Sequence, residues 1–509
     1  MQANSTEQAP PPAQVPSSHS SRILTNASFR AIADIGSKLA TFALYLIVAR
    51  KVGASQFGVF VFAVSFGTIA VTLGQFGQEF VLVREVARDH RKLDAYYSDV
   101  LLSRVMLSVP PLLVALLVAY LTGIDSRTLL VILLMGVGFI GDYLIQVSFA
   151  VFQAFERVGL MPVVLIVQRW LTTAVAVVLL ALGAGIVGVA AVYCAGAALA
   201  ACMAAWLLHR KVARPPMRLS VSGALAVTRA AVPIGLGMVT FMLLSRIDML
   251  MLAAFKPSAQ VGQYGAAYRL LETTAFVTWS VNVAVLPTMA RLSPTSVPPV
   301  GAVFQRALKL VLAITLPTAA GAAILASPLI ALLYGAPYHP SAAALALLAA
   351  TITLAPVSSL SSQLLYSQGA KWVVGVTYAT VFVENVLLNL VLIPRYSLDG
   401  AALGTSISEV LLSGTLLFYS RQQRGRLELR RLLAGSLAGT VAASAVMAYF
   451  HTRLAVAVPV AIVVYLVVLL LSERLAFPED FAVMRSFLAQ LGRRSGNSMP
   501  AVVPDAGPH

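Results

Sequence analysis

The chain has 509 residues, of which 59% are apolar and only 11% are charged, and its mean hydropathy is +0.85. Soluble domains contain about 45–50% apolar and about 25% charged residues, so this composition excludes an ordinary soluble globular protein. The 36 Lys and Arg residues outnumber the 20 Asp and Glu residues, which gives a formal charge of +16. In a soluble protein this excess would suggest nucleic acid binding, but cytoplasmic loops of membrane proteins also collect positive charge.

Long apolar segments follow one another along most of the chain. A membrane-spanning helix needs about 20 apolar residues, and a backbone in hydrocarbon must satisfy its own hydrogen bonds. We therefore predict an all-α, polytopic membrane protein with about 14 transmembrane helices. The predicted segments are residues 27–49, 57–79, 99–122, 128–151, 160–182, 187–208, 229–253, 264–288, 307–333, 342–365, 372–393, 399–420, 432–450 and 454–472.

The two ends of the chain differ from the apolar segments between them. Residues 1–22 are polar and proline-rich, which predicts a disordered cytoplasmic tail, and residues 495–509 are predicted to be a second disordered tail. Residues 478–494 place apolar side chains at helical spacing beside arginines. This pattern predicts a short helix lying on the inner leaflet.

The distribution of basic residues predicts the orientation. With the N-terminus in the cytoplasm, 25 Lys and Arg residues fall on the cytoplasmic side, six on the opposite side and five at membrane depth. Because positive charge accumulates in cytoplasmic loops, both termini are predicted to be cytoplasmic. The same bias accounts for most of the basic excess, so no nucleic acid partner is expected.

An internal repeat relates two parts of the chain. Gln56-Phe57-Gly58 recurs as Gln263-Tyr264-Gly265, and in each copy an arginine lies 27 residues after the aromatic residue. Gly188 and Gly400 open matching apolar segments, 31 and 29 residues after a basic residue. Each unit holds six helices, an even number, so the units run in the same sense, and a central cavity is expected where they meet.

The repeat predicts the domain organisation. An N-terminal six-helix bundle over residues 23–209 precedes a basic cytoplasmic linker over residues 210–228. A C-terminal six-helix bundle over residues 229–420 follows, and residues 432–472 form two additional transmembrane helices outside the repeat.

Seven short stretches of the chain carry a resemblance to a known family. They are residues 51–60 (KVGASQFGVF), 83–85 (VRE), 246–248 (RID), 261–268 (VGQYGAAY), 333–335 (LYG), 392–394 (LIP) and 400–402 (GAA). These stretches resemble the polysaccharide transporters or lipid-linked oligosaccharide flippases of the MOP superfamily, which also contains the MATE exporters. The resemblance covers about residues 25–420 and implies two helical bundles around a central cavity in the bacterial inner membrane.

Charged residues inside the predicted helices are the candidate site residues. A charge at a helix centre costs roughly 2.5–3.5 kcal/mol and usually faces a cavity or a partner. The cations are predicted to bind phosphate oxygens of the substrate. The acids are candidates for coupling transport to protons or sodium, because burial disfavours a charged carboxylate. The cations are Lys38, Arg169, Arg246 and Arg269, and the acids are Asp248, Glu272, Glu384 and Glu409.

Each charge also has a purely structural interpretation. Lys38 shares one helix face with Arg30 and Asp34, which predicts either a self-neutralised ladder or a cavity-lining stripe. Arg169 is expected either to face the cavity or to support Glu384 or Glu409.

Two further pairs lie close together in the sequence. Arg246 and Asp248 are two residues apart and point in nearly opposite directions on a helix, so at least one of them needs another partner. Arg269 and Glu272 are three apart, which favours an ordinary pair within one helix.

No motif indicates an enzyme. The run Gly136-Val-Gly-Phe-Ile-Gly141 matches GxGxxG, but it lies inside an apolar helix with no strand before it. Small-residue helix packing explains it, as it explains Gly435 and Gly439. We therefore expect no catalytic residue, no cofactor and no bound metal.

The predicted function follows from the resemblance and the buried cations. It is translocation of a polyprenyl-diphosphate-linked oligosaccharide, a repeat unit of a cell-surface polysaccharide, from the cytoplasmic to the outer leaflet by alternating access. The expected partners are this glycolipid, membrane lipids and other polysaccharide-assembly membrane proteins. One alternative is a cation-coupled exporter of small amphiphiles. Another is a membrane glycosyltransferase or polymerase, but the short loops leave little room for one.

Overall fold

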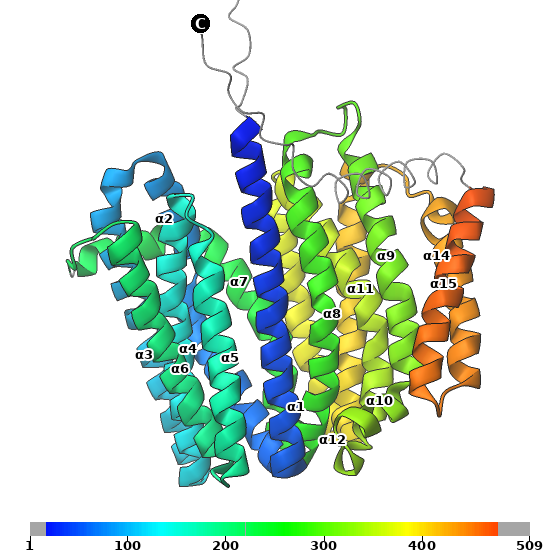
Figure 1. The fold of residues 1–509 in the computed structure, drawn as a ribbon, viewed down its shortest axis with the longest axis horizontal. Coiled ribbons are helices and arrows are strands. Elements are labelled where there is room, and N and C mark those ends of the chain that lie inside the picture. Colours follow the sequence, from blue (N-terminus) through cyan, green and yellow to red (C-terminus); the bar gives the residue numbers. More distant parts are fainter. Residues whose placement is uncertain (1–16, 219, 477–509) are drawn as a thin grey trace, which may run out of the picture. The chain divides into compact units, whose positions relative to one another are not determined.

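The structure is a computed structural model that describes residues 17–218 and 220–476. Within these residues it is helical throughout and contains no strand (Figure 1), so the predicted all-α membrane class is confirmed. Helix α1 begins at Ser17, which places residues 17–22, assigned to the N-terminal tail, inside a helix. The rest of that tail, the interfacial helix predicted over residues 478–494 and the tail over residues 495–509 lie outside the described residues.

The chain divides into two compact units, Met1–Arg246 and Ile247–His509. The elements of the first unit are α1 (Ser17–Gln75), α2 (Gln78–Arg88), η1 (His90–Lys92), α3 (Leu93–Leu121), α4 (Ser126–Ala154), α5 (Leu160–Ala181), α6 (Gly185–Lys211) and most of α7 (Val221–Phe255). Those of the second unit are α8 (Ser258–Arg291), α9 (Val300–Ile324), α10 (Ala326–Leu333), η2 (Ala336–Tyr338), α11 (Ser341–Ser367), α12 (Lys371–Tyr419), α13 (Arg421–Arg424), α14 (Leu429–Tyr449) and α15 (Leu454–Ala476).

Twelve helical stretches of the described chain are long and apolar enough to cross a membrane. Two of them each contain two predicted segments, joined across a residue that leaves helical geometry. In α1 this residue is Gly53, with φ of 78°, and in α12 it is Ser397, with φ of 57°. Nine of the other ten stretches hold one predicted segment each. The tenth, Val300–Ile324, holds only part of the segment predicted over residues 307–333, which continues into the separate short helix α10.

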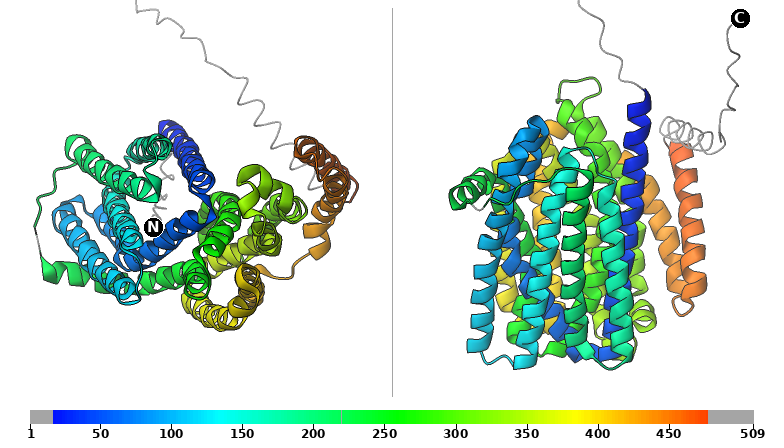
Figure 2. Two further views of the ribbon diagram at one scale, coloured as in Figure 1. Left: turned by 90° about the horizontal axis from the view of Figure 1, so that it is seen from below. Right: turned by 60° about the vertical axis from the view of Figure 1, so that its left-hand side comes forward.

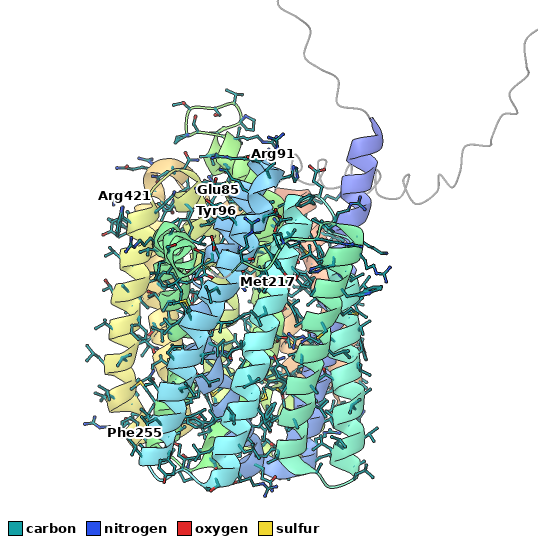
Figure 3. The ribbon with its side chains drawn as sticks, turned by 90° about the vertical axis from the view of Figure 1, so that its left-hand side faces the viewer. Glu85, Arg91, Tyr96, Met217, Phe255 and Arg421 are labelled. Carbon is teal, nitrogen blue, oxygen red and sulfur yellow. The ribbon has the colours of Figure 1, made fainter. Side chains whose placement is uncertain are left out.

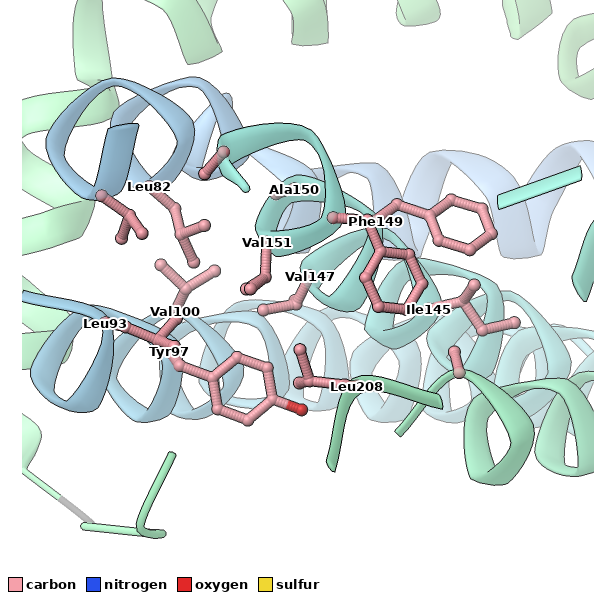
Figure 4. Packing of buried hydrophobic residues seen from close by; sticks show 14 of the residues in the cluster. Leu82, Leu93, Tyr97, Val100, Ile145, Val147, Phe149, Ala150, Val151 and Leu208 are labelled. Carbon is pink, nitrogen blue, oxygen red and sulfur yellow. The ribbon is translucent and has the colours of Figure 1, made fainter. Parts of the chain in front are cut away.

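In the first unit, α4 contacts both α3 and α6, and its glycines permit a close approach. A Cβ atom at Gly138 would lie 2.7 Å from the Tyr193 ring, and one at Gly141 would lie 3.1 Å from the Cβ of Ala197. The GxGxxG run is therefore a helix-packing surface, as predicted. Near one end of the unit an apolar core joins α2, α3, α4 and α6, with Leu82, Val147 and Leu208 among its members (Figure 4).

The end of the first unit at which α2 terminates is strongly basic. Arg84, Arg88, Arg91 and Lys92 lie there, and Lys92 pairs with Glu85 at 2.8 Å. Figure 3 shows Glu85 and Arg91 together at this end of the helices. This is the end that the positive-charge bias predicts to be cytoplasmic.

In the second unit, α11 packs against α8, α9 and α12. The pair α14 and α15, the two helices predicted to lie outside the repeat, packs on α9 (Figure 2). Gly439 permits this pairing, because a Cβ atom there would lie 2.9 Å from the Tyr465 ring. At the end of α15, Lys309 of α9 forms an ion pair of 2.6 Å with the buried Glu473.

Candidate functional site

Arg169 lies in a polar network of the first unit. Its Nη2 atom is 2.9 Å from Oδ2 of Asp142, which also accepts a hydrogen bond from the Tyr193 hydroxyl at 2.6 Å. The Oδ1 atom of Asp142 accepts one from the Gln168 amide at 2.5 Å. The four side chains come from α4, α5 and α6. Arg169 was predicted to face the cavity or to support Glu384 or Glu409. Asp142 was not among the predicted site residues, although an aspartate inside the segment 128–151 is a visible signal.

A second buried cation of the first unit is Arg104 on α3, which is only 1% exposed. Its Nη2 atom lies 2.8 Å from Oε2 of Glu79, and its Nη1 atom donates to the backbone carbonyl of Tyr143. A charge buried this deeply must be paired with an opposite charge. Both described arginines at membrane depth in α3 and α5 are therefore neutralised by carboxylates of neighbouring helices.

Lys38 and Arg246, the other cations predicted in this unit, have different environments. The Lys38 side chain is exposed on α1, whereas Arg246 is half-buried on α7. The side chains of Arg30 and Asp34 lie outside the described part of the structure, so the predicted ladder with Lys38 stays a prediction.

In the second unit, Arg269 and Glu272 form the predicted pair within one helix. The Arg269 Nη1 atom lies 2.7 Å from the Glu272 Oε2 atom, three residues further along α8. This confirms the structural interpretation of the spacing. Arg269, like Arg169, therefore has a carboxylate partner beside it.

Asp248 is the most deeply buried acid predicted from the sequence, with 2% of its surface exposed. Its Oδ2 atom accepts hydrogen bonds from the Thr405 hydroxyl at 2.5 Å and the Tyr264 hydroxyl at 3.2 Å, and its Oδ1 atom accepts one from the Asn389 amide at 3.1 Å. All three donors are neutral. This agrees with the expectation that Asp248 and Arg246 do not simply cancel each other.

Glu384 and Glu409 are also held by neutral groups. The Ser408 hydroxyl donates to Glu384 at 2.8 Å, and the Ser358 hydroxyl donates to Glu409 at 2.6 Å. Among the described residues neither acid forms an ion pair, and neither does Asp248. Within the second unit, three predicted coupling acids therefore have hydroxyl and amide partners instead of cations.

The kink of α12 at Ser397 brings these groups together. It folds the helix into two arms, with Asn389 on the first and Thr405 on the second. Close approach of the arms needs glycine, because a Cβ atom at Gly400 would lie 2.2 Å from the Leu392 carbonyl oxygen, and one at Gly404 would lie 2.5 Å from Oδ1 of Asn389. The repeat landmark Gly400 is thus explained by packing next to the site.

Of the donors to Asp248, Tyr264 was recognised from the sequence only as a landmark of the repeat, and Asn389 and Thr405 were not recognised. Asn385 and Asn389 are spaced by four residues inside an apolar segment, which places them on one helix face. That spacing was a usable signal. Thr405 carried a weaker one, because threonine is common in membrane helices and only the fold brings it to the carboxylate.

An apolar cavity of about 410 Å³ lies elsewhere in the second unit. Residues of α8, α9, α11, α14 and α15 line it, including Gly321, Leu345, Met447, Ala461 and Leu466. Its walls are almost entirely hydrocarbon, so it suits an apolar chain better than a sugar or a phosphate.

Comparison with known proteins agrees with this fold. Residues 23–293, more than half of the chain, match the family described as polysaccharide biosynthesis protein, whereas a search of curated proteins gave no match. The chain is similar to a structure of the lipid II flippase MurJ in an inward closed conformation, with 15% identity and a TM-score of 0.72 over 88% of this chain and 99% of that one.

Two exporter structures are also similar. One is an inward-facing multidrug resistance MATE family transporter of the MOP superfamily, with 17% identity and a TM-score of 0.63 over 76% of this chain and 94% of that one. The other is a MATE transporter of Vibrio cholerae, with 16% identity and a TM-score of 0.55 over 80% and 99%.

The fold defines the class: this is a multi-pass membrane protein with the architecture of the MOP superfamily of transporters and flippases. Within that class, the sequence match over residues 23–293 is decisive. The chain belongs to the polysaccharide biosynthesis protein family, as the resemblance in the sequence analysis implied.

Proposed function

We propose that this protein is a flippase that moves a polyprenyl-diphosphate-linked oligosaccharide from the cytoplasmic to the outer leaflet of the bacterial inner membrane, with both termini in the cytoplasm. The observation that carries the proposal is the match of residues 23–293 to the polysaccharide biosynthesis family. The similarity in fold to a lipid II flippase supports it. Translocation by alternating access makes and breaks no covalent bond, so the protein needs no catalytic residue.

The cations are proposed to bind the diphosphate. Lys38, Arg169, Arg246 and Arg269 are the candidates, and two of them, Arg169 and Arg269, each have a carboxylate within 3 Å. A diphosphate could compete with those carboxylates, since phosphate oxygens accept the same bidentate hydrogen bonds from arginine. In this proposal Arg169 and Arg269 contribute when substrate displaces or shares their acidic partners.

Asp248 is proposed as the coupling group. It lies at membrane depth with only neutral donors around it, so a proton or a monovalent cation can neutralise it without first displacing a basic residue. Among the described residues Asp248 forms no ion pair, so a bound proton or cation would be its positive counter-charge. Glu384, Glu409 and Glu272 are secondary candidates.

The apolar cavity is proposed to hold part of the polyprenyl tail while the glycan crosses. Burial of hydrocarbon in a preformed apolar cavity is favourable at about 25 cal/mol per Å². The cavity lies within the second unit. In this proposal the polar head group is bound by the cationic residues and not by the cavity.

The rival within transport is a cation-coupled exporter of small amphiphiles. The similarity to MATE structures and the carboxylate partners of Arg169 and Arg269 favour this alternative. The two functions differ in the importance of Lys38 and Arg246, because an exporter of cationic amphiphiles has no use for a phosphate ligand.

Translocation in proteoliposomes tests the proposal. Wild type should move a fluorescent polyprenyl-diphosphate oligosaccharide across the bilayer, and Lys38→Ala and Arg246→Ala should each reduce the rate at least tenfold. Arg453→Ala, which removes an exposed arginine between α14 and α15, is the matched control and should leave the rate unchanged. Failure of the wild type to move the glycolipid, together with efflux of amphiphilic cations, would decide for the exporter.

A further inference from the structure

An unbroken series of side-chain hydrogen bonds connects Asp248 with Glu384. The Asn389 amide donates to Asp248 at 3.1 Å and to the Asn385 carbonyl oxygen at 3.0 Å. The Asn385 amide donates to the Ser408 hydroxyl at 3.1 Å, and that hydroxyl donates to Glu384 at 2.8 Å. The three linking side chains are almost completely buried, so water does not compete for these bonds.

The direction of every bond in this series is determined from the Glu384 end. A serine hydroxyl has one proton, and Ser408 gives it to Glu384. Ser408 can therefore only accept from Asn385, which must turn its NH₂ group toward the serine. The Asn385 carbonyl oxygen then faces Asn389.

The orientation of Asn389, next to Asp248, follows in the same way. Because Asn389 meets a carbonyl oxygen of Asn385, it must also present its NH₂ group there. That group has two protons, and the second one reaches Asp248. The carbonyl oxygen of Asn389 is left on the opposite side, beside Gly404, without a hydrogen bond in the described structure.

We propose that Glu384 is a positioning residue that acts on Asp248 at a distance. By accepting the serine proton, Glu384 holds both asparagine amides in one orientation, so that an N–H group and not a carbonyl oxygen faces Asp248. An ionised Asp248 can only accept, so it holds Asn389 in the same orientation from its own end. When the Glu384 acceptor is removed, Ser408 can donate to Asn385, and both amides can turn over as Asp248 takes up a proton. The Asn389 oxygen then accepts a hydrogen bond from the protonated carboxyl, which favours the neutral form.

This inference rests on the proposed coupling role of Asp248. The change expected in the protonation midpoint of Asp248 has the opposite sign to the change that a direct charge effect of Glu384 would cause. Loss of a hydrogen bond to a carboxylate favours the protonated form, whereas loss of a neighbouring negative charge favours the carboxylate. The other titratable group in contact with Asp248 is Tyr264 of α8, which remains in every variant.

Difference infrared spectroscopy of the full-length protein in lipid nanodiscs can follow the carbonyl band of protonated Asp248 as a function of pH. The band is identified by its loss in Asp248→Asn. In Glu384→Leu its midpoint should move about one unit toward higher pH, because a hydrogen bond to a charged group is lost. Ser408→Ala breaks the same series with a smaller change in shape and should move the midpoint in the same direction.

Two matched variants separate orientation from charge. Glu384→Gln removes the charge and keeps a carbonyl oxygen that can accept the Ser408 proton, so the midpoint should not rise. Glu409→Gln removes the adjacent acid, which bonds to Ser358 outside the series, and should also cause no rise.

The midpoints measured by infrared spectroscopy test the inference without any measurement of transport. A rise in Glu384→Leu and Ser408→Ala alone supports it. A fall or no change in both, an equal rise in Glu409→Gln, or no Asp248 band in the wild type overturns it. Failure of wild-type glycolipid translocation would refute the proposed function while leaving the spectroscopic result intact.

Discussion

The acids Asp142 and Glu79 of the first unit and Asp248 of the second unit have different kinds of partner. In the first unit, Asp142 faces Arg169 and Glu79 faces Arg104, so each acid is balanced by a cation. In the second unit, Asp248 is balanced only by hydroxyl and amide donors. A paired charge is held in place, whereas a carboxylate among neutral donors can still take up a positive charge. The first arrangement suits a scaffold and the second suits a coupling site.

The sequence repeat shows how this difference arises. Tyr193 and Thr405 each follow a landmark glycine by five residues, and each donates its hydroxyl to the buried aspartate of its own unit. Phe57 and Tyr264 are the other matching pair, and both are fully buried. Only Tyr264 has a hydroxyl to give to Asp248. One added oxygen atom thus turns a packing position into part of the site.

The largest expected effect comes from breaking an ion pair of the first unit. Glu79→Ala leaves Arg104 buried without its carboxylate, which should lower the free energy of unfolding by about 3–5 kcal/mol. The measurement is the thermal unfolding midpoint of the purified protein. Glu85→Ala is the control, because its partners Arg84 and Lys92 are 59% and 44% exposed and exposed ion pairs contribute little to stability. Equal losses in the two variants would contradict this description of the first unit.

The next prediction compares the two buried aspartates directly. Asp142→Asn should lower stability by about 3–5 kcal/mol, because Arg169 loses its counter-charge. Asp248→Asn should change stability by about 1 kcal/mol or less, because its neutral donors can adjust to an amide. Ion-driven transport, measured in proteoliposomes, should fall at least tenfold in Asp248→Asn. A strongly destabilised Asp248→Asn with normal transport would remove the distinction between the units.

A smaller effect is expected where the arms of α12 approach each other. Gly404→Ala places a methyl group 2.5 Å from the Asn389 oxygen, and overpacking of this kind costs about 1–3 kcal/mol. Gly414→Ala on the same helix meets no atom within 4 Å and should be neutral or slightly stabilising. Thermal unfolding of the two variants distinguishes close packing at the site from a general intolerance of alanine in this helix.

The smallest effect concerns the start of α4. Asp125 accepts hydrogen bonds from the Thr128 hydroxyl and backbone N–H, and these bonds lower the pKa of its carboxyl. Asp125→Ala should lose about 1 kcal/mol of stability at neutral pH, whereas Asp125→Asn should retain most of it. Because the folded pKa is the lower one, the contribution is present above the unfolded pKa of about 3.9 and is lost as pH falls through the folded value. The difference between wild type and Asp125→Ala should therefore shrink in strong acid to the part that an uncharged cap contributes.

Much of the fold could be predicted because membrane helices must be long, apolar and self-satisfied in their hydrogen bonds. The fourteen segments, the helical class and the packing role of Gly138 all follow from that requirement. The breaks at Gly53 and Ser397 were visible only as loops between segments, and the structure shows that helix continues up to each of them.

The candidate site was predictable only in part. Composition and hydropathy alone determined that the protein lies in a membrane. Asp248, Glu384 and Arg169 were identified as unusual because each is a charged residue inside an apolar segment. The partners of these charges depended on which helices pack together, because side chains such as Asp142 and Thr405 lie far from them in the sequence. Electrostatic roles are set by distances of about 3 Å, and only the tertiary structure brings groups that close.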